Sequence, residues 1–246
     1  TGDAEGNHRL FVTGYGNASK YNNSDKNATN VSFHRYGDCY KAIRQANIFL
    51  QKAHVITAGG TQGDELLEPE LKRYQANARF MRAFYHYLLF EQYGPIIIVG
   101  DKVYEATESQ DMSRNSVDEV VEYLDKELLA SADELSQEPI IGENYRAEPT
   151  KGVALAVRAK MWVYAASPLL NGGFNEALNI ANPDGKKLFP IADAAKGERA
   201  RQACADFINY ANENNRYELY YAAPEKNGVV NPEKSVYELF QKYTKE

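Results

Sequence analysis

The sequence predicts an all-α protein in which long helices form antiparallel pairs joined by long loops. Three observations support this prediction. Five stretches of the chain place apolar residues at helical spacing, Gly and Pro separate these stretches, and the stretch from residue 71 to residue 93 is apolar on two adjoining faces. A helix that is apolar on two faces has to be covered on two sides, which is the position of an inner helix in a layered array.

The first predicted helix spans residues 36–55 and follows a segment, residues 1–35, that is rich in Gly, Asn, Ser and Thr and is expected to be loop-like. The apolar face of the helix consists of Tyr40, Ile43, Asn47 and Leu50. Asp38 lies in the first turn, where its charge favours the positive end of the helix dipole. Because Asn47 lies among apolar neighbours, we expect its amide to hold a neighbouring loop by hydrogen bonds.

The second predicted helix, residues 70–93, carries two apolar series. The first series consists of Tyr74, Ala78, Met81, Tyr85 and Leu88, and the second of Phe80, Phe84, Tyr87 and Glu91. Arg82 falls between the two faces, so we expect a carboxylate or helix-terminal carbonyl groups as its partner. Gly94 and Pro95 end the helix, because the first lacks a β-carbon and the second a backbone donor. Residues 96–99 are too few for another helix and are expected to form a short buried extended segment.

The third and fourth predicted helices span residues 115–136 and 150–168. In the third, Ser116 and Glu119 have the spacing of a capping box. Its core stripe consists of Val117, Val120, Val121, Leu124, Leu128 and Leu135. The fourth helix is rich in alanine, which lets neighbouring helices approach closely. Trp162 lies in its middle and is expected in the core.

The fifth predicted helix, residues 198–213, is the last one that the spacing supports. Its stripe consists of Ala200, Ala203, Phe207, Tyr210 and Ala211. Residues 217–221 and 236–240 are expected to be extended or loop-like. Helices in this order, longer and less regular than the tetratricopeptide consensus, predict a tetratricopeptide-like α-solenoid.

The composition excludes several classes of function. At 246 residues and 43% hydrophobic content, the chain has the composition of an ordinary soluble globular protein. Its net charge is −6, and its 28 basic residues are scattered among 34 acidic ones, which argues against nucleic-acid binding. The longest apolar run is far shorter than the roughly 20 residues of a membrane-spanning helix.

No catalytic or metal-binding motif is visible in the sequence. The four histidines, His8, His34, His54 and His86, show no metal-ligand spacing, and a phosphate loop, a nucleophile elbow and an HExxH motif are missing. We therefore expect no metal, no cofactor and no catalysis, although a pair of glycosidase carboxylates cannot be recognised in a sequence. Cys39 and Cys204 fall in apolar helical patterns, which favours two separate thiols over a disulfide.

Four blocks of the sequence, taken in order, resemble the SusD/RagB family, the surface nutrient-binding lipoproteins of the outer membrane of Bacteroidota. The blocks are CYKAIRQANIFL (39–50), ANARFMRAFYHYLLFEQYGPIIIV (76–99), SRNSVDEVVEYLDKELLASADEL (113–135) and EPTKGVALAVRAKMWVYAASPLLNGG (148–173), with a weaker fifth block at 200–220. Asn77 stands where family members usually carry an acidic residue, which affects an expected ion pair with a neighbouring Arg.

The resemblance implies an incomplete SusD-like fold. Residues 1–35 correspond to a loop-rich N-terminal segment, residues 36–220 to the tetratricopeptide-like helical scaffold, and residues 221–246 to the start of a C-terminal SusD/RagB region that is missing. Family members are much longer and carry a lipid-bearing N-terminal cysteine. We therefore expect this chain to be the helical scaffold portion of a longer protein.

The resemblance also implies a function. The full protein is expected to bind oligosaccharide on the extracellular side of the outer membrane, held there by an N-terminal lipid that this chain lacks. It would pass the ligand, chemically unchanged, to a SusC-like TonB-dependent transporter. Two alternatives stay open: a helical-repeat scaffold that binds a protein partner, and a receptor that captures peptides, as some family members do.

By resemblance, the ligand residues lie just before the first helix and in its first turn. They are Tyr21, Phe33, His34, Tyr36, Asp38 and Lys41. Aromatic rings at these positions would stack on the apolar faces of sugar rings, and the polar groups would bind hydroxyl groups. Alternatively, Phe33 and Tyr36 only pack against the start of the helix as a hydrophobic staple.

Overall fold

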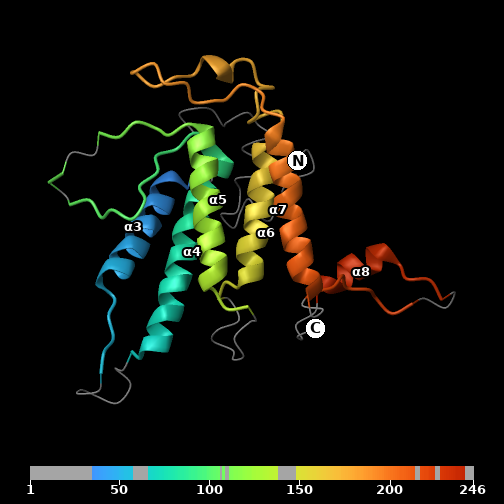
Figure 1. The fold of residues 1–246 in the computed structure, drawn as a ribbon. Helices are drawn as coiled ribbons and strands as arrows, with labels where there is room; N and C mark the ends of the chain where they lie inside the picture. Colours follow the sequence, from blue (N-terminus) through green and yellow to red (C-terminus); the bar gives the residue numbers. More distant parts are fainter. Residues whose placement is uncertain are drawn as a thin grey trace, which may run out of the picture.

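The fold is all-α, as the apolar spacing predicts. The computed structural model describes residues 35–57, 66–105, 107–108, 111–137, 148–213, 217–224 and 228–241, and the structural statements below concern these residues (Figure 1). They form six α-helices and one short 3₁₀-helix. Within them, pairing of extended backbone is limited to two isolated bridges, Ile56 with Leu66 and Ala181 with Lys187.

The helices match the sequence prediction closely at five of six positions. They are α3 (Tyr36–Lys52), α4 (Glu68–Tyr93), α5 (Val117–Glu134), α6 (Lys151–Ala165), α7 (Ala195–Asn212) and α8 (Pro232–Leu239), with the 3₁₀-helix η2 at Ala177–Asn179. The first five coincide with the predicted helices to within three residues at each end. The predicted capping box of α5 is confirmed, because Ser116 and Glu119 each bind the backbone N–H of the other.

The sixth helix, α8, corrects a prediction. An extended or loop-like segment was expected at residues 236–240, but a helix covers most of it. Pro232 occupies the first turn, where a missing N–H costs nothing, and the Asn231 side chain accepts a hydrogen bond from the Lys234 N–H at 3.2 Å. The helix therefore begins at this cap, and the short apolar run at its end does not by itself predict a helix.

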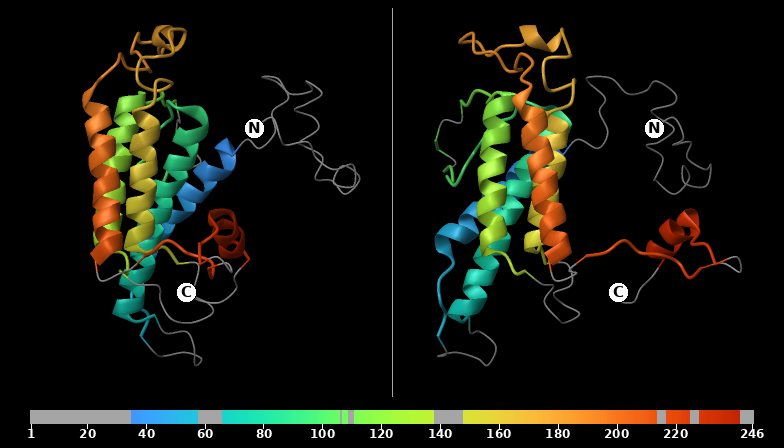
Figure 2. Two further views of the ribbon diagram at one scale, coloured as in Figure 1. Left: turned by 90° about the vertical axis from the view of Figure 1, so that its right-hand side faces the viewer. Right: turned by 45° about the vertical axis from the view of Figure 1, so that its right-hand side comes forward.

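Consecutive helices from α3 to α7 pack against each other in sequence order (Figures 1 and 2). Paired residues show that they run antiparallel. The backbone of Arg35, before α3, binds Tyr93 at the end of α4, and Asp133 at the end of α5 pairs with Lys151 at the start of α6. Packing of each helix mainly on its chain neighbours is the arrangement of an α-solenoid.

The apolar core lies where α4, α5 and α6 meet. Its largest fully buried side chains include Phe90, Leu124, Leu128, Met161 and Trp162. The prediction that Trp162 is a core residue is therefore confirmed. At the start of α6, a β-carbon on Gly152 would lie 2.5 Å from the hydroxyl of Tyr217, so the Tyr217 ring can rest on this helix only because residue 152 is glycine.

Acidic residues of α5 pair with basic residues on each neighbouring helix. The pairs are Glu127 with Arg82 and Glu134 with Arg79 of α4, Asp125 with Arg158 and Asp133 with Lys151 of α6, and Asp118 with Lys196 and Glu122 with Arg199 of α7. Arg158 also binds Asp206 of α7 at 2.8 Å, so one guanidinium joins three helices. We call the six acidic residues of α5 in these pairs, which do not include Asp206, the α5 acidic series.

A buried polar group links α3 and α4 to the loop after α4. The Arg82 guanidinium donates to Glu127 Oε2 at 2.7 Å and to Asn47 Oδ1 at 3.2 Å. Asn47 Nδ2 donates to the carbonyl oxygens of Gly100 and Lys102 at 3.0 and 3.1 Å. Two predictions are thus confirmed: Arg82 has a carboxylate partner, and the Asn47 amide holds a loop.

His86 holds the same loop through a hydrogen bond from the loop backbone. The Val99 N–H donates to His86 Nε2 at 3.4 Å, so Nδ1 carries the ring hydrogen and donates to the Arg82 carbonyl oxygen at 2.8 Å. Burial lowers the pKa of His86 to about 4, and the nearby Arg82 charge acts in the same direction. The ring is therefore neutral at neutral pH.

The segment after Pro95 is neither helix nor strand, in keeping with the prediction, but only Ile96 of its four residues is fully buried. The Tyr40 hydroxyl donates to the Ile97 carbonyl at 2.9 Å and accepts from the Ile97 N–H at 3.1 Å, which holds the segment against α3. The two cysteines are separate free thiols as predicted, although Cys204 is only partly buried. None of the described helices combines the length and apolarity that crossing a membrane requires.

Tyr217 still packs on α6 and α7, but residues 218–224 and 228–241, with α8, extend away from the helix array, and we call them the arm (Figure 1). Many of its apolar side chains are exposed: Leu219, Tyr221, Val229, Val236, Tyr237, Leu239 and Phe240. Exposed apolar side chains mark an interaction surface where they form one contiguous patch.

Candidate functional site

The start of α3 lies against the end of α4, and three tyrosine rings meet there. The Tyr36 ring lies 4.8 Å from the Tyr40 ring and 5.4 Å from the Tyr93 ring, edge to face in both cases. The Arg35 N–H donates to the Tyr93 hydroxyl at 3.1 Å. The rings meet because the two helices are antiparallel and Gly94 ends α4 directly after Tyr93. We call Tyr36, Tyr40 and Tyr93 the tyrosine cluster.

A small hollow adjoins the tyrosine cluster along the chain. It has a volume of about 340 Å³ and is lined by Arg35, Leu88, Glu91 and Gln92. Arg35 precedes Tyr36, and Gln92 precedes Tyr93, so the hollow and the rings are neighbours along the chain at the same end of the helix pair. A guanidinium, a carboxylate and an amide together offer donors and acceptors for the hydroxyl groups of a polar ligand.

The charge of Glu91 in this hollow is fixed by its neighbours. Lys160 Nζ lies 2.8 Å from Glu91 Oε1, and the Tyr87 hydroxyl donates to the same oxygen at 3.0 Å. The hydrogen bond from Lys160 holds the pKa of Glu91 below its usual range, despite partial burial. Burial raises the pKa of Tyr87, which therefore stays protonated. Glu91 is thus an ionised acceptor at neutral pH.

The six sequence-predicted ligand residues have different outcomes. Tyr21, Phe33 and His34 lie outside the described residues. Tyr36 is 39% exposed and belongs to the tyrosine cluster. Asp38 and Lys41 are exposed and form an ion pair of 3.5 Å with each other, away from the cluster. Their role in ligand binding stays a prediction, and so does the alternative that Tyr36 only staples the helix.

Sequence reasoning missed four residues of this region: Arg35, Glu91, Gln92 and Tyr93. The last turn of the second helix was interpreted as packing surface only, and Arg35 as part of a loop. A signal was available, because an antiparallel pair of helices, the second of which ends at Gly94, must bring Tyr93 beside the first turn of the first helix.

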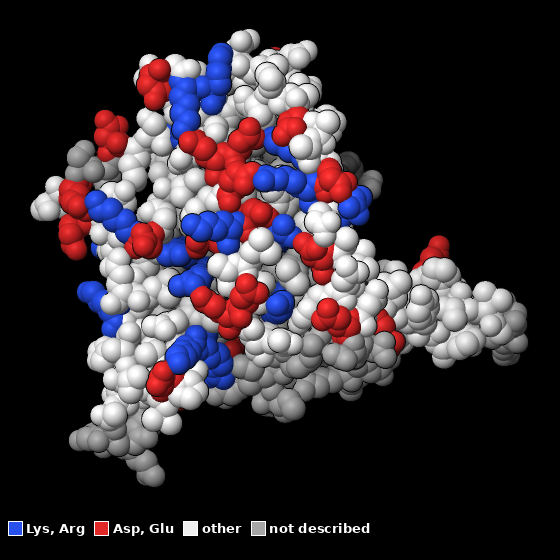
Figure 3. Space-filling view, in the orientation of Figure 1, with Lys and Arg blue, Asp and Glu red and all other residues white. Residues whose placement is uncertain are grey.

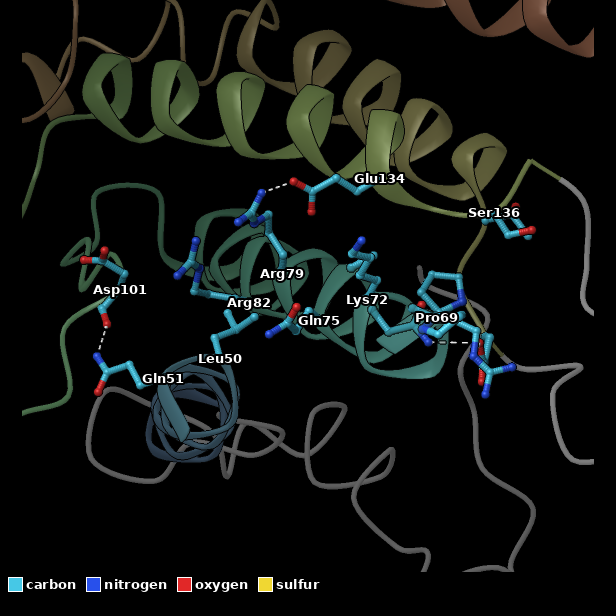
Figure 4. Close-up of a pocket in the computed structure, with 16 residues that line it drawn as sticks. Leu50, Gln51, Pro69, Lys72, Gln75, Arg79, Arg82, Asp101, Glu134 and Ser136 are labelled. Atoms are coloured by element: carbon cyan, nitrogen blue, oxygen red, sulfur yellow. Dashed lines mark hydrogen bonds and ion pairs between the residues drawn. The ribbon is translucent and has the colours of Figure 1, made fainter. Parts of the chain in front are cut away.

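A second and larger cavity, of about 870 Å³, is a groove along α4 near the other end of α3 (Figure 4). It is lined by Leu50, Gln51, Pro69, Lys72, Arg73, Gln75, Ala76, Asn77, Arg79, Arg82, Asp101, Glu134, Ser136, Glu148, Pro149 and Thr150. Figure 4 shows Arg79 reaching from α4 toward Glu134 on α5. At one end, Gln51 donates to the carbonyl oxygen of Asp101 at 2.9 Å. We call this cavity the α4 groove.

Basic and acidic side chains are interspersed on the face shown in Figure 3, without a large patch of one sign. Within the described ranges, no group of three or more His, Cys, Asp or Glu residues is placed to hold a metal ion. Both cavities therefore offer hydrogen bonds and local ion pairs as their means of binding.

Comparisons with known proteins agree with this architecture. A SusD-like family model, described as "Starch-binding associating with outer membrane", matches residues 3–163. The solved structure of a protein called BT4246 aligns with a TM-score of 0.70 and 28% identity, over 89% of this chain and 38% of its own. Curated protein sequences gave no match.

A second solved structure, a SusD-like protein (BF3747) from Bacteroides fragilis, is more distant. It aligns with a TM-score of 0.51 and 20% identity, over 77% of this chain and 28% of its own. Similarity at that level concerns the fold alone. The chain spans less than half the length of either solved protein.

Proposed function

The chain belongs to the SusD-like family, whose model is described as starch-binding and associated with the outer membrane, and from this membership we propose that the protein binds an oligosaccharide at the cell surface without changing it chemically. The structural observation that carries the proposal is the tyrosine cluster. The half-exposed ring of Tyr36 offers an apolar face for a sugar ring, and the adjoining hollow offers charged and amide groups for hydroxyls.

The proposal extends to the partner and the location of the protein. Family membership supports delivery of the ligand to a SusC-like TonB-dependent transporter, on the extracellular side of the outer membrane. Tyr21, Phe33, His34, Asp38 and Lys41 stay in the proposed ligand surface together with Tyr36. Arg35, Glu91, Gln92 and Tyr93 join it on the geometry of the hollow.

Isothermal titration with starch-derived oligosaccharides, after a glycan-array screen, tests the proposal. Tyr36→Ala should weaken binding by about tenfold or more, as loss of one stacked ring does in other aromatic platforms. Tyr36→Phe should bind as the unchanged chain does. Tyr237→Ala, which removes an exposed ring in the arm, is the matched control. A lowered melting temperature with unchanged affinity in Tyr36→Ala would show that Tyr36 is only a staple.

The arm favours a second function, binding of a protein partner, with the arm as the contact. Its exposed apolar side chains include Leu219 and Val236, and Phe240 is 84% exposed. Burying such residues against a partner is the main favourable term in protein association. Replacing these three residues with Ser should abolish co-purification of a membrane partner and leave the helix content unchanged. Retained co-purification would exclude the arm as the contact.

A further inference from the structure

The floor of the α4 groove is a row of hydrogen-bond donors. Lys72, Gln75, Arg79 and Arg82 all line the groove and follow one another at helical spacing, so they share one face of α4. Helices α3 and α5 pack on either side of α4 and supply the walls. Three acidic residues also line the groove: Glu134 on α5, Asp101 in the loop after α4, and Glu148 before α6, which accepts a hydrogen bond from Asn77 at 2.9 Å.

Two donors of the floor, Lys72 and Arg79, are only weakly engaged. Arg79 pairs with Glu134, and Lys72 pairs with Glu68, but all four side chains are more than a third exposed. Exposed ion pairs of this kind contribute little, so a carboxylate from a ligand can replace the partner at small cost. The Gln75 amide makes no hydrogen bond with any described residue.

Arg82, at the C-terminal end of the floor, is already engaged inside the chain. Its side chain is nine-tenths buried, and its Nε–H has no acceptor among the described residues, although its terminal nitrogens bind Glu127 and Asn47. A buried donor without an acceptor is costly. The Nε atom is closed to solvent, so a ligand in the groove does not reach it, and Arg82 acts as an internal link of the chain.

The length and lining of the groove define its occupant. From Pro69 to Arg82 the floor extends about 20 Å along the helix, which is the length of about six residues of extended chain. The described lining residues include no aromatic ring on which a sugar could stack. We propose that the α4 groove binds an extended acidic segment of another protein, about six residues long, with its carboxylates on Lys72 and Arg79.

This site is separate from the tyrosine cluster. Tyr36 is the first residue of α3, whereas Leu50 and Gln51, which line the groove, lie in its last turn. The two sites can therefore be occupied together, and the groove does not depend on the proposed glycan binding.

The test uses the 246-residue chain and a fluorescent capped peptide of six residues in which glutamate alternates with alanine. Arg79→Gln should weaken binding by about fivefold, because it removes one ion pair. Glu134→Gln should strengthen binding by a similar factor, because it releases Arg79 from its internal partner. Arg201→Gln, which breaks an exposed pair with Glu198 on α7, is the control and should leave the affinity unchanged. Added salt should weaken binding.

Opposite responses to Arg79→Gln and Glu134→Gln are the decisive result, since simple loss of folding would weaken binding in both variants. Equal binding of a peptide with glutamine in place of glutamate would overturn the proposal. Tighter binding of oligogalacturonate with the same number of carboxylates, lost in Arg79→Gln, would also overturn it and make the groove an acidic-glycan site.

Discussion

His86 makes the stability of the chain depend on pH in a calculable way. In the folded chain its pKa is about 4, whereas an exposed histidine has a pKa of about 6.5. Between these values the unfolded chain binds a proton that the folded chain does not. The contribution of His86 to the free energy of unfolding is therefore fully present above pH 6.5. It is lost as the pH falls toward 4, by about 3 kcal/mol in total.

The matched perturbation is His86→Gln, which removes the titrating ring and keeps a polar side chain. The free energy of unfolding in urea can be followed by the fluorescence of Trp162, the single tryptophan of the chain and a core residue. Between pH 7.5 and pH 5, the unchanged chain should lose about 2 kcal/mol more than His86→Gln does. His54→Gln, which removes an exposed histidine, controls for the loss of a ring.

Parallel curves for the unchanged chain and His86→Gln would refute this reasoning. They would mean that the ring is charged in the folded chain, or that the loop after α4 opens and hydrates it. In that case the hydrogen bond from the Val99 N–H to His86 Nε2 would not hold the loop in solution.

Three further predictions concern stability and are measured by urea unfolding. Arg82→Met should destabilise the chain by about 3 kcal/mol, because it leaves the largely buried Glu127 without its partner. Adding Glu127→Leu should restore most of the lost stability. A small effect on stability with a selective loss of ligand binding would contradict the structural role of Arg82. Gly152→Ala should destabilise the chain by about 1–3 kcal/mol through its clash with Tyr217. In a Tyr217→Ala background the same change should be neutral or stabilising. A loss of the same size in both backgrounds would point to another cause. Ser116→Ala should cost about 1 kcal/mol through loss of the cap on α5, and an unchanged midpoint would show that the capping box contributes nothing.

The sequence predicts a helix when the apolar spacing and the start and end signals of that helix are visible in its own residues. Helix α4 is predictable because its two apolar series are long and its end at Gly94 is unambiguous. Helix α8 is not, because it depends on a two-residue start, Asn231 and Pro232, ahead of an apolar run too short to tell helix from strand.

The candidate site is less predictable because it depends on offsets between helices. That Arg82 needs a buried partner follows from its position on α4, but the identity of Glu127 follows only from the register of α5 against α4. In the same way, Tyr36 can be singled out from its place before the first turn, whereas Tyr93 becomes its neighbour only through the offset of α3 and α4.

The α5 acidic series therefore helps to fix the register of neighbouring helices along their axes. Alanine-rich surfaces such as that of α6 slide easily, but a slip of one turn, about 5.4 Å, would separate Asp125 from Arg158 and Asp133 from Lys151 together. Through Arg82 the same constraint reaches α3. The height at which Tyr36 meets Tyr93 thus depends on the buried pair in the middle of the array, and reversing the charge of Glu127 should misalign the tyrosine rings without touching them.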